Sequence, residues 1–175
     1  MKVIFLDFEG ILNDWEHFIE LVPAKVEQLK KIIDATNAVV VVTSSLSYYL
    51  SLCDLPVMVK NWFIDLEKLG IKIYDYVNEV DKINRRYYEI LDYLNRHPEI
   101  EEYVILDDDY ILKEFLDHLV FIEYYTGLLD EHVDAAINIL NGNLGLYPKT
   151  LDLTLTPYDI NIRNNIYNNT KTHKK

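Results

Sequence analysis

Short, continuous runs of hydrophobic residues recur along the chain and predict the buried strands of a parallel sheet. The clearest runs lie at residues 3–6, 38–42 and 103–106, and none of them contains a charged residue. A parallel sheet is covered by helices on both faces, so its strands lack the alternation of polar and apolar residues that marks a half-exposed strand. Residues 71–74 and 119–122 predict two further strands.

The segments between these runs carry hydrophobic residues at helical spacing. Residues 23–35 place Val26, Leu29 and Ile32 on one face, and Pro23 suits the first turn of that helix. Further helices are predicted at residues 46–52, 62–69, 81–96, 111–116 and 130–140. Strands that alternate with helices predict an α/β protein built from right-handed βαβ units.

Polar side chains directly follow three of the predicted strands. Asp7 follows the first run, Thr43, Ser44 and Ser45 follow the second, and Asp107 and Asp108 follow the run at 103–106. The carboxyl ends of parallel strands meet at one edge of the sheet, where open α/β sheets bind their ligands. Carboxylates gathered there repel one another unless a hard cation lies between them, and hydroxyl groups can hold a phosphate oxygen. The sequence therefore predicts a Mg²⁺ site at this edge.

These motifs resemble those of the haloacid dehalogenase (HAD) superfamily of phosphohydrolases, and within it the small capless HAD domains of Swiss Army knife RNA-repair proteins. The first motif of the family reads hydrophobic-Asp-x-Asp-Gly-Val-Leu-Asn, and residues 6–13 read Leu-Asp-Phe-Glu-Gly-Ile-Leu-Asn. Thr43 matches the second motif, and Asp107 and Asp108 match the fourth. The resemblance covers residues 1–141 and implies a three-layer Rossmann-like fold with a parallel sheet of strand order 3-2-1-4-5.

The third motif of the family supplies a Lys or Arg shortly before the fourth strand. In the subfamily it is an Arg three residues ahead of a Glu-Ile pair, which matches Arg86, whereas most of the superfamily uses Lys, which favours Lys82. Basic residues in the first turn of a helix run against the macrodipole, so their presence indicates a functional demand. Whichever residue it is, this cation is expected to bind the phosphate and to hold Asp7 ionised.

The resemblance implies a Mg²⁺-dependent phosphatase that works through an aspartyl-phosphate on Asp7. It places the metal between Asp7, Asp107, Asp108 and the backbone carbonyl of Glu9. Phosphatases of the superfamily use an Asp at the position of Glu9 to protonate the leaving group and then to activate water. Glu9 is one methylene longer, and a displacement of about an ångström can cost on the order of a hundredfold in rate.

The phosphate itself is expected to bind to Thr43, Ser44 and the cation of the third motif, Arg86 or Lys82. Two departures from the family favour a different function. Glu9 stands where the family carries Asp, and Ser47 stands where the subfamily carries Arg. The alternative is a catalytically weak or inactive HAD-like domain that binds a phosphorylated partner. A further alternative is a phosphatase that acts on nucleic-acid ends.

Length and composition set the remaining expectations. The 175 residues, half of them hydrophobic, suit one domain at residues 1–142, followed by an extension at 143–175 that contains a candidate edge strand and an Asn-rich tail. The net charge of −12 argues against general nucleic-acid binding. The single Cys53 and the absence of a signal peptide or a long apolar span predict a cytoplasmic protein without a membrane anchor. The oligomeric state is not predicted.

The intervals between the motifs are too short for the cap domain that many members of the superfamily carry. The first interval is filled by one loop and one helix, and the second by a short helix pair and a strand. We therefore expect no full cap and an open site. Such a site admits a bulky phosphorylated substrate, such as a polymer end or a protein.

Overall fold

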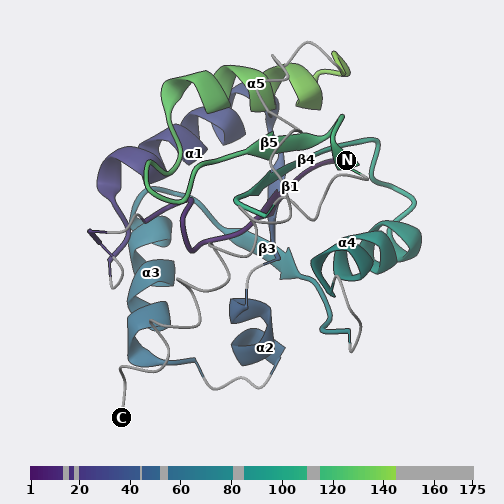
Figure 1. Cartoon of the computed structure of the whole chain (residues 1–175). Helices are drawn as coiled ribbons and strands as arrows, with labels where there is room; N and C mark the ends of the chain where they lie inside the picture. The colour runs from purple at the N-terminus through teal and green to yellow at the C-terminus, as the bar shows by residue number, and fades with distance from the viewer. Residues whose placement is uncertain are drawn as a thin grey trace, which may run out of the picture.

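The computed structural model describes residues 1–13, 16–17, 20–43, 45–51, 55–80, 85–109 and 115–144. Within these residues, one sheet contains the strands β1 (Lys2–Leu6), β2 (Val39–Val42), β3 (Ile73–Tyr76), β4 (Glu102–Asp107) and β5 (Leu119–Phe121). The strand order is β3-β2-β1-β4-β5, and every neighbouring pair is parallel. The predicted α/β fold and strand order are confirmed, and β1 lies beside β4 at the centre (Figure 1).

Helices cover both faces of this sheet. The described helices are α1 (Pro23–Thr36), α2 (Leu46–Ser51), α3 (Val57–Lys68), α4 (Arg85–Arg96) and α5 (Asp130–Leu140). Buried residues of α1, α3 and α5 share one hydrophobic core with the sheet, and buried residues of α4 share a second core with the other face. The result is a three-layer arrangement, with α1 packed beside α5 and α4 on the opposite side (Figure 1).

The two cores explain why residues 3–6 of β1 are hydrophobic on both faces of the strand. Ile4 and Leu6 belong to the core beneath α1, α3 and α5, whereas Val3 and Phe5 belong to the core beneath α4. All four side chains have 0% exposed surface. A strand that is buried on both faces has no position for a polar side chain, so the run of hydrophobic residues follows directly from its central place.

Several predicted boundaries differ from the structure. The third strand is Ile73–Tyr76 rather than 71–74, because the buried Ile71 closes α3 by donating its N–H to the Leu66 carbonyl (3.0 Å). Helix α3 begins at Val57, directly after Pro56, rather than at residue 62. Most of the predicted helix at 111–116 and the whole predicted strand at 151–156 lie outside the described residues.

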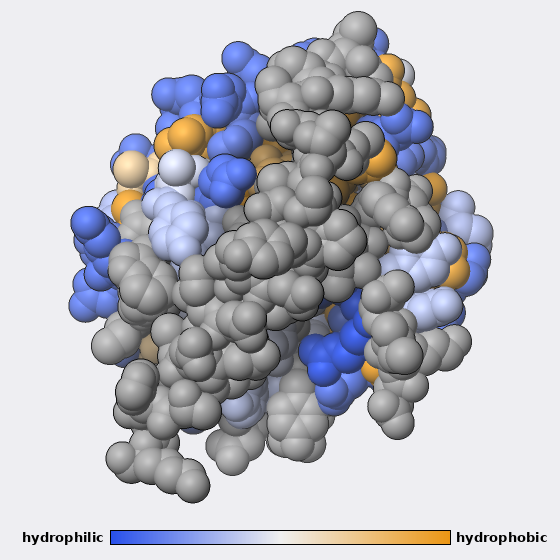
Figure 2. Space-filling view, in the orientation of Figure 1, coloured by the Kyte–Doolittle hydropathy of each residue, from blue (hydrophilic) through white to orange (hydrophobic). Residues whose placement is uncertain are grey.

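The described parts of the intervals between the motifs contain no cap domain. Helix α1 lies between β1 and β2, and α2, α3 and β3 lie between β2 and α4. No described helix is long and apolar enough to span a bilayer. On the face shown in Figure 2, the visible hydrophobic surface of the described residues is divided into small areas between hydrophilic ones. The division into residues 1–142 and 143–175 stays a prediction, since the structure describes the chain only as far as residue 144.

Candidate active site

The ends of three neighbouring strands bring Asp7, Thr43 and Asp107 to the same edge of the sheet. The register of the sheet pairs Leu6 with Val42 on one side and with Leu106 on the other. Beyond these pairs, the Asp7 N–H donates to the Leu106 carbonyl and the Thr43 N–H donates to the Leu6 carbonyl, both at 3.0 Å. The backbone of the site is therefore a direct continuation of the sheet.

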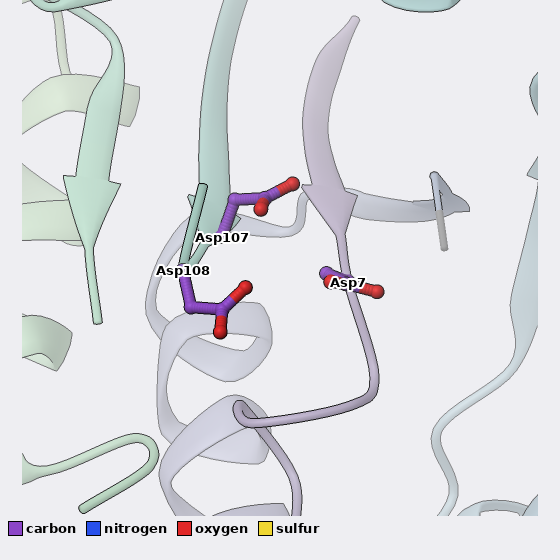
Figure 3. Close-up of side chains that lie close together, drawn as sticks. All are labelled: Asp7, Asp107 and Asp108. Atoms are coloured by element: carbon purple, nitrogen blue, oxygen red, sulfur yellow. The ribbon is translucent and has the colours of Figure 1, made fainter. Parts of the chain in front are cut away.

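Three carboxylates converge at this edge. Asp7, Asp107 and Asp108 each offer an oxygen, and these oxygens all lie within 4.8 Å of one another. Asp7 extends from the end of β1, while Asp107 and Asp108 extend from the end of β4 (Figure 3). Asp7 and Asp107 are buried and Asp108 is half-buried. Carboxylate oxygens in this arrangement fit a hard divalent cation such as Mg²⁺, which takes one or two carboxylates together with substrate oxygens.

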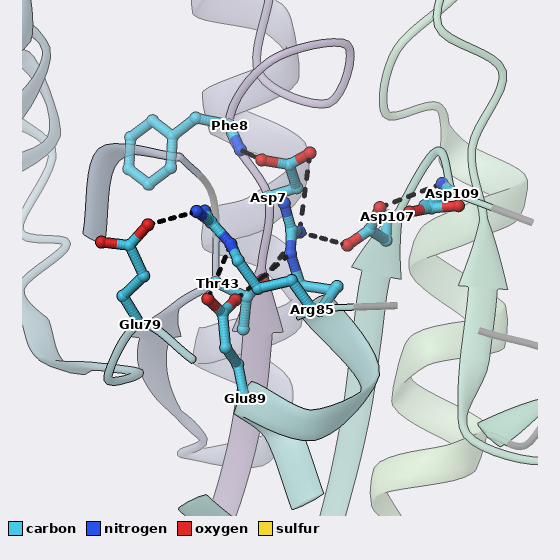
Figure 4. A network of polar contacts seen from close by, with 9 residues as sticks. Asp7, Phe8, Thr43, Glu79, Arg85, Glu89, Asp107 and Asp109 are labelled. Carbon is cyan, nitrogen blue, oxygen red and sulfur yellow. Dashed lines mark hydrogen bonds and ion pairs between the residues drawn. The ribbon is translucent and has the colours of Figure 1, made fainter. Parts of the chain in front are cut away.

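Backbone amides orient two of these carboxylates. One oxygen of Asp7 accepts a hydrogen bond from the Phe8 N–H (2.9 Å), and one oxygen of Asp107 accepts a hydrogen bond from the Asp109 N–H (3.0 Å) (Figure 4). In both residues the other oxygen faces the guanidinium of Arg86, at 3.7 Å from Asp7 and 2.5 Å from Asp107. Asp109 therefore fixes the Asp107 carboxylate through its backbone amide.

Among the described residues, Arg86 brings a positive charge into direct contact with this cluster. It lies in the first turn of α4, and its Nη1 atom also donates to the Thr43 hydroxyl at 3.3 Å. Burial by itself lowers the pKa of Arg86, but the carboxylates of Asp107, Asp7 and Glu89 raise it above its usual value. The guanidinium therefore stays charged. The other predicted candidate, Lys82, lies outside the described residues.

Burial changes the proton affinities of two of these carboxylates, those of Asp7 and Asp107. Burial raises the pKa of Asp7, against the lowering effect of Arg86 and of the Phe8 amide. The pKa of Asp107 is raised well above its usual value, by burial first and also by the charges of Asp7, Asp108 and Asp109, although Arg86 opposes this. A carboxyl group with a raised pKa resists ionisation, and a bound divalent cation would relieve that resistance.

Glu9 lies at the same edge but on its exposed side. Its carboxylate accepts a hydrogen bond of 3.4 Å from the Ser45 hydroxyl, just beyond the end of β2. Its side chain is outside the cluster of three aspartates, and its predicted metal contact through the backbone carbonyl stays a prediction. Ser44 lies outside the described residues, whereas Ser45, which belongs to the same predicted group of hydroxyls, lies beside Glu9.

A tight turn at Gly10 connects the first motif to the rest of the site. Gly10 has a φ of +81°, and a β-carbon there would lie 2.6 Å from the ring of Tyr124 and 3.2 Å from an Asp108 oxygen, so no larger residue fits. The Gly10 N–H donates to the side chain of the buried Asn13 (2.8 Å). Sequence reasoning assigned no role to Asn13 or Tyr124. The three-residue spacing between Gly10 and Asn13 was the available signal for Asn13.

Comparison with known proteins agrees with the geometry. The chain matches the family model described as the HAD domain in Swiss Army Knife RNA repair proteins over residues 3–133, which is more than half of its length. No curated protein and no solved structure gives a significant match. The family match and the aspartate cluster support a phosphatase-like hydrolase. The chain belongs to the family of HAD domains found in Swiss Army Knife RNA repair proteins.

Proposed function

We propose that this protein is a Mg²⁺-dependent phosphatase in which Asp7 is the nucleophile. The observation that carries the proposal is the convergence of three aspartates with one guanidinium and one hydroxyl, those of Arg86 and Thr43, at a single edge of the sheet. A binding module has no need of a buried aspartate beside an arginine. A nucleophile for phosphoryl transfer needs both, because it must be ionised and must approach a negatively charged group.

The proposed reaction gives each of these side chains, together with Glu9, a separate role. A carboxylate oxygen of Asp7 attacks phosphorus, the bond from phosphorus to the leaving oxygen breaks, and an acyl phosphate forms on Asp7. Glu9 donates a proton to the leaving oxygen. Water then attacks the phosphorus, Glu9 accepts its proton, and free phosphate and the Asp7 carboxylate are restored. Arg86 and Thr43 stabilise the charge that spreads over the phosphoryl oxygens.

The aspartate cluster fits the metal that this chemistry uses. Asp7, Asp107 and Asp108 would hold Mg²⁺, and their burial and mutual repulsion make the site unfavourable without a cation. When bound, the ion neutralises the carboxylates and the phosphoryl oxygens. Two of the three carboxylates are already oriented by backbone amides.

The open edge supports a bulky phosphorylated substrate. In the part of the chain that the structure describes, no cap covers the ends of β1 and β4. A phosphorylated protein or a phosphorylated polymer end could therefore approach Asp7. The net charge of −12 disfavours a nucleic acid as this substrate, because the protein repels the phosphate backbone of the nucleic acid unless cations screen it.

Phosphate release from an aryl phosphate tests the proposal. We expect hydrolysis with Mg²⁺ and none with EDTA. We also expect Mg²⁺ at about one hundred times its dissociation constant to raise the free energy of unfolding by about 2.7 kcal/mol, because the ion binds only the folded cluster. Steady-state kinetics and thermal unfolding measure the two effects. Hydrolysis that continues unchanged in EDTA would contradict the metal assignment.

Glu9 favours a second candidate, a domain that binds a phosphorylated partner and turns over slowly or not at all. Its side chain is longer than the usual Asp and is held by Ser45 on the exposed side of the site. If the protein is an active phosphatase whose turnover is limited by the position of the Glu9 carboxylate, we expect Glu9→Asp to raise kcat by up to about a hundredfold. Glu9→Gln is the matched control and should lower kcat. A wild-type protein that binds phosphate, releases none from esters and gains nothing from Glu9→Asp would favour the second candidate.

A further inference from the structure

A buried carboxylate that the proposed reaction does not use lies directly behind Arg86. Glu89, on α4, has 0% exposed surface. Its polar contacts are ion pairs with Arg85 and Arg86 and a hydrogen bond from the backbone of Val80. Burial raises its pKa, and Arg85, Arg86 and the backbone of Val80 lower it. A buried carboxylate usually costs stability relative to a hydrophobic residue of similar volume, so its presence calls for a reason.

The two arginines that begin α4 share this carboxylate. The Nε atom of Arg85 lies 2.9 Å from one oxygen of Glu89, and the Nε atom of Arg86 lies 4.0 Å from the other. Arg85 is partly exposed and also pairs with Glu79, away from the aspartate cluster (Figure 4). Arg86 instead directs its Nη1 atom to Thr43, Asp107 and Asp7. Glu89 therefore faces one end of the Arg86 guanidinium, and the aspartate cluster faces the other.

We propose that Glu89 is a positioning residue, whose carboxylate holds the Arg86 guanidinium in the orientation that binds the phosphoryl group. The proposal rests on the proposed phosphatase function. Two of the contacts of Nη1 are with Asp7 and Asp107, carboxylates that would also hold the metal, and the third is with the Thr43 hydroxyl, which would bind the phosphate, so these contacts compete with metal and substrate. The contact with Glu89 does not compete, because Glu89 lies outside the aspartate cluster. It can persist throughout the reaction, and its burial protects it from screening by salt.

Glu89→Gln tests this role, because it removes the charge and keeps the shape. We expect kcat for an aryl phosphate to fall on the order of a hundredfold, as for a misplaced catalytic group. Binding of inorganic phosphate, measured by titration calorimetry, should weaken by about tenfold, as when one charge-assisted hydrogen bond is misaligned. In a protein that already carries Arg86→Gln, Glu89→Gln should cause almost no further loss of kcat or of phosphate affinity, because Glu89 acts through Arg86.

Asp92→Asn is the matched control. Asp92 forms an exposed i,i+4 pair with Arg96 on the same helix (2.8 Å), so its loss should change neither kcat nor phosphate binding. The proposal would be overturned if Glu89→Gln lowered the unfolding temperature but left the phosphate affinity unchanged. It would also be overturned if the losses of kcat or phosphate affinity caused by Arg86→Gln and Glu89→Gln were additive in the double variant. If the wild type hydrolyses no ester, yet Glu89→Gln still weakens phosphate binding, the phosphatase function fails and the positioning role stands.

Discussion

Asp7→Asn is expected to lower the rate of phosphate release by at least about a thousandfold, because the amide cannot form the acyl phosphate. Of the described substitutions, this one should have the largest effect on activity. Asn retains the size of the side chain and an oxygen for the Phe8 N–H, which donates to Asp7 at 2.9 Å. The fold should therefore remain intact. Single-turnover and steady-state phosphate release would measure the loss.

The same substitution is expected to make the metal-free protein more stable at pH 7. Burial raises the pKa of Asp7 above its usual value of 3.8, in opposition to Arg86. A carboxyl group with a raised pKa contributes its stability below that usual value, where it is protonated, and loses it as the pH rises through the raised pKa. At pH 7, above the usual value, the raised pKa makes folding less favourable, and the neutral Asn removes both that cost and the repulsion with Asp107.

Asp65→Asn provides the control for both effects. Asp65 forms an exposed pair with Lys68 (2.8 Å), so removal of its charge should leave activity and stability almost unchanged. Denaturant unfolding in EDTA measures the change in stability. If Asp7→Asn retained most of the activity, Asp7 could not be the nucleophile. If the metal-free Asp7→Asn protein were less stable than the wild type, the charge of Asp7 would stabilise the fold.

Arg86→Gln is expected to have the second-largest effect, and here activity and stability should fall together. The loss of a donor that stabilises the transferring group should cost on the order of a hundredfold to a thousandfold in kcat. The substitution also leaves Asp107 and Glu89, both with 0% exposed surface, without the guanidinium that faces them. Breaking a buried ion pair in this way typically costs about 3–5 kcal/mol.

Two comparisons make the Arg86 result specific. Arg96→Gln removes an exposed arginine from the other end of α4 and should cost at most about 1 kcal/mol, with no loss of kcat. Lys82→Gln addresses the alternative that the sequence left open, and we expect a much smaller loss than for Arg86→Gln. A larger loss in Lys82→Gln would assign the third motif to Lys82. Kinetics with each variant at saturating Mg²⁺ would separate the two.

The site illustrates why strand-borne residues were easier to predict than helix-borne ones. Asp7, Thr43, Asp107 and Asp108 each follow a hydrophobic run, and the ends of parallel strands meet by geometry alone. Asn13 and Tyr124, to which the sequence assigned no role, lie on connecting turns, and no periodicity fixes the direction of a turn. Arg86 could be chosen from the spacing of a family motif, but its contacts depend on how α4 packs against the sheet.

Glu89 shows the limit most clearly. Its spacing of three and four residues from Arg86 and Arg85 indicates ion pairs on a helix surface, where a glutamate is ordinarily solvated. The tertiary structure instead buries it completely beside both guanidinium groups. The third strand was displaced for a similar reason, because the contact of Ile71 with the end of α3 delays the start of β3.

The sequence by itself determined the class of the fold and the edge at which the chemistry is concentrated, and its resemblance to the HAD superfamily implied the order of the strands. The first two follow from local patterns, because uninterrupted hydrophobic runs are typical of strands buried on both faces, and acids at the ends of those strands share one edge. Only the tertiary structure decided which cation reaches Asp7 and Asp107 among the described residues, and which carboxylate lies behind it. Those outcomes depend on side-chain reach and burial across elements far apart in the chain, which no local pattern records.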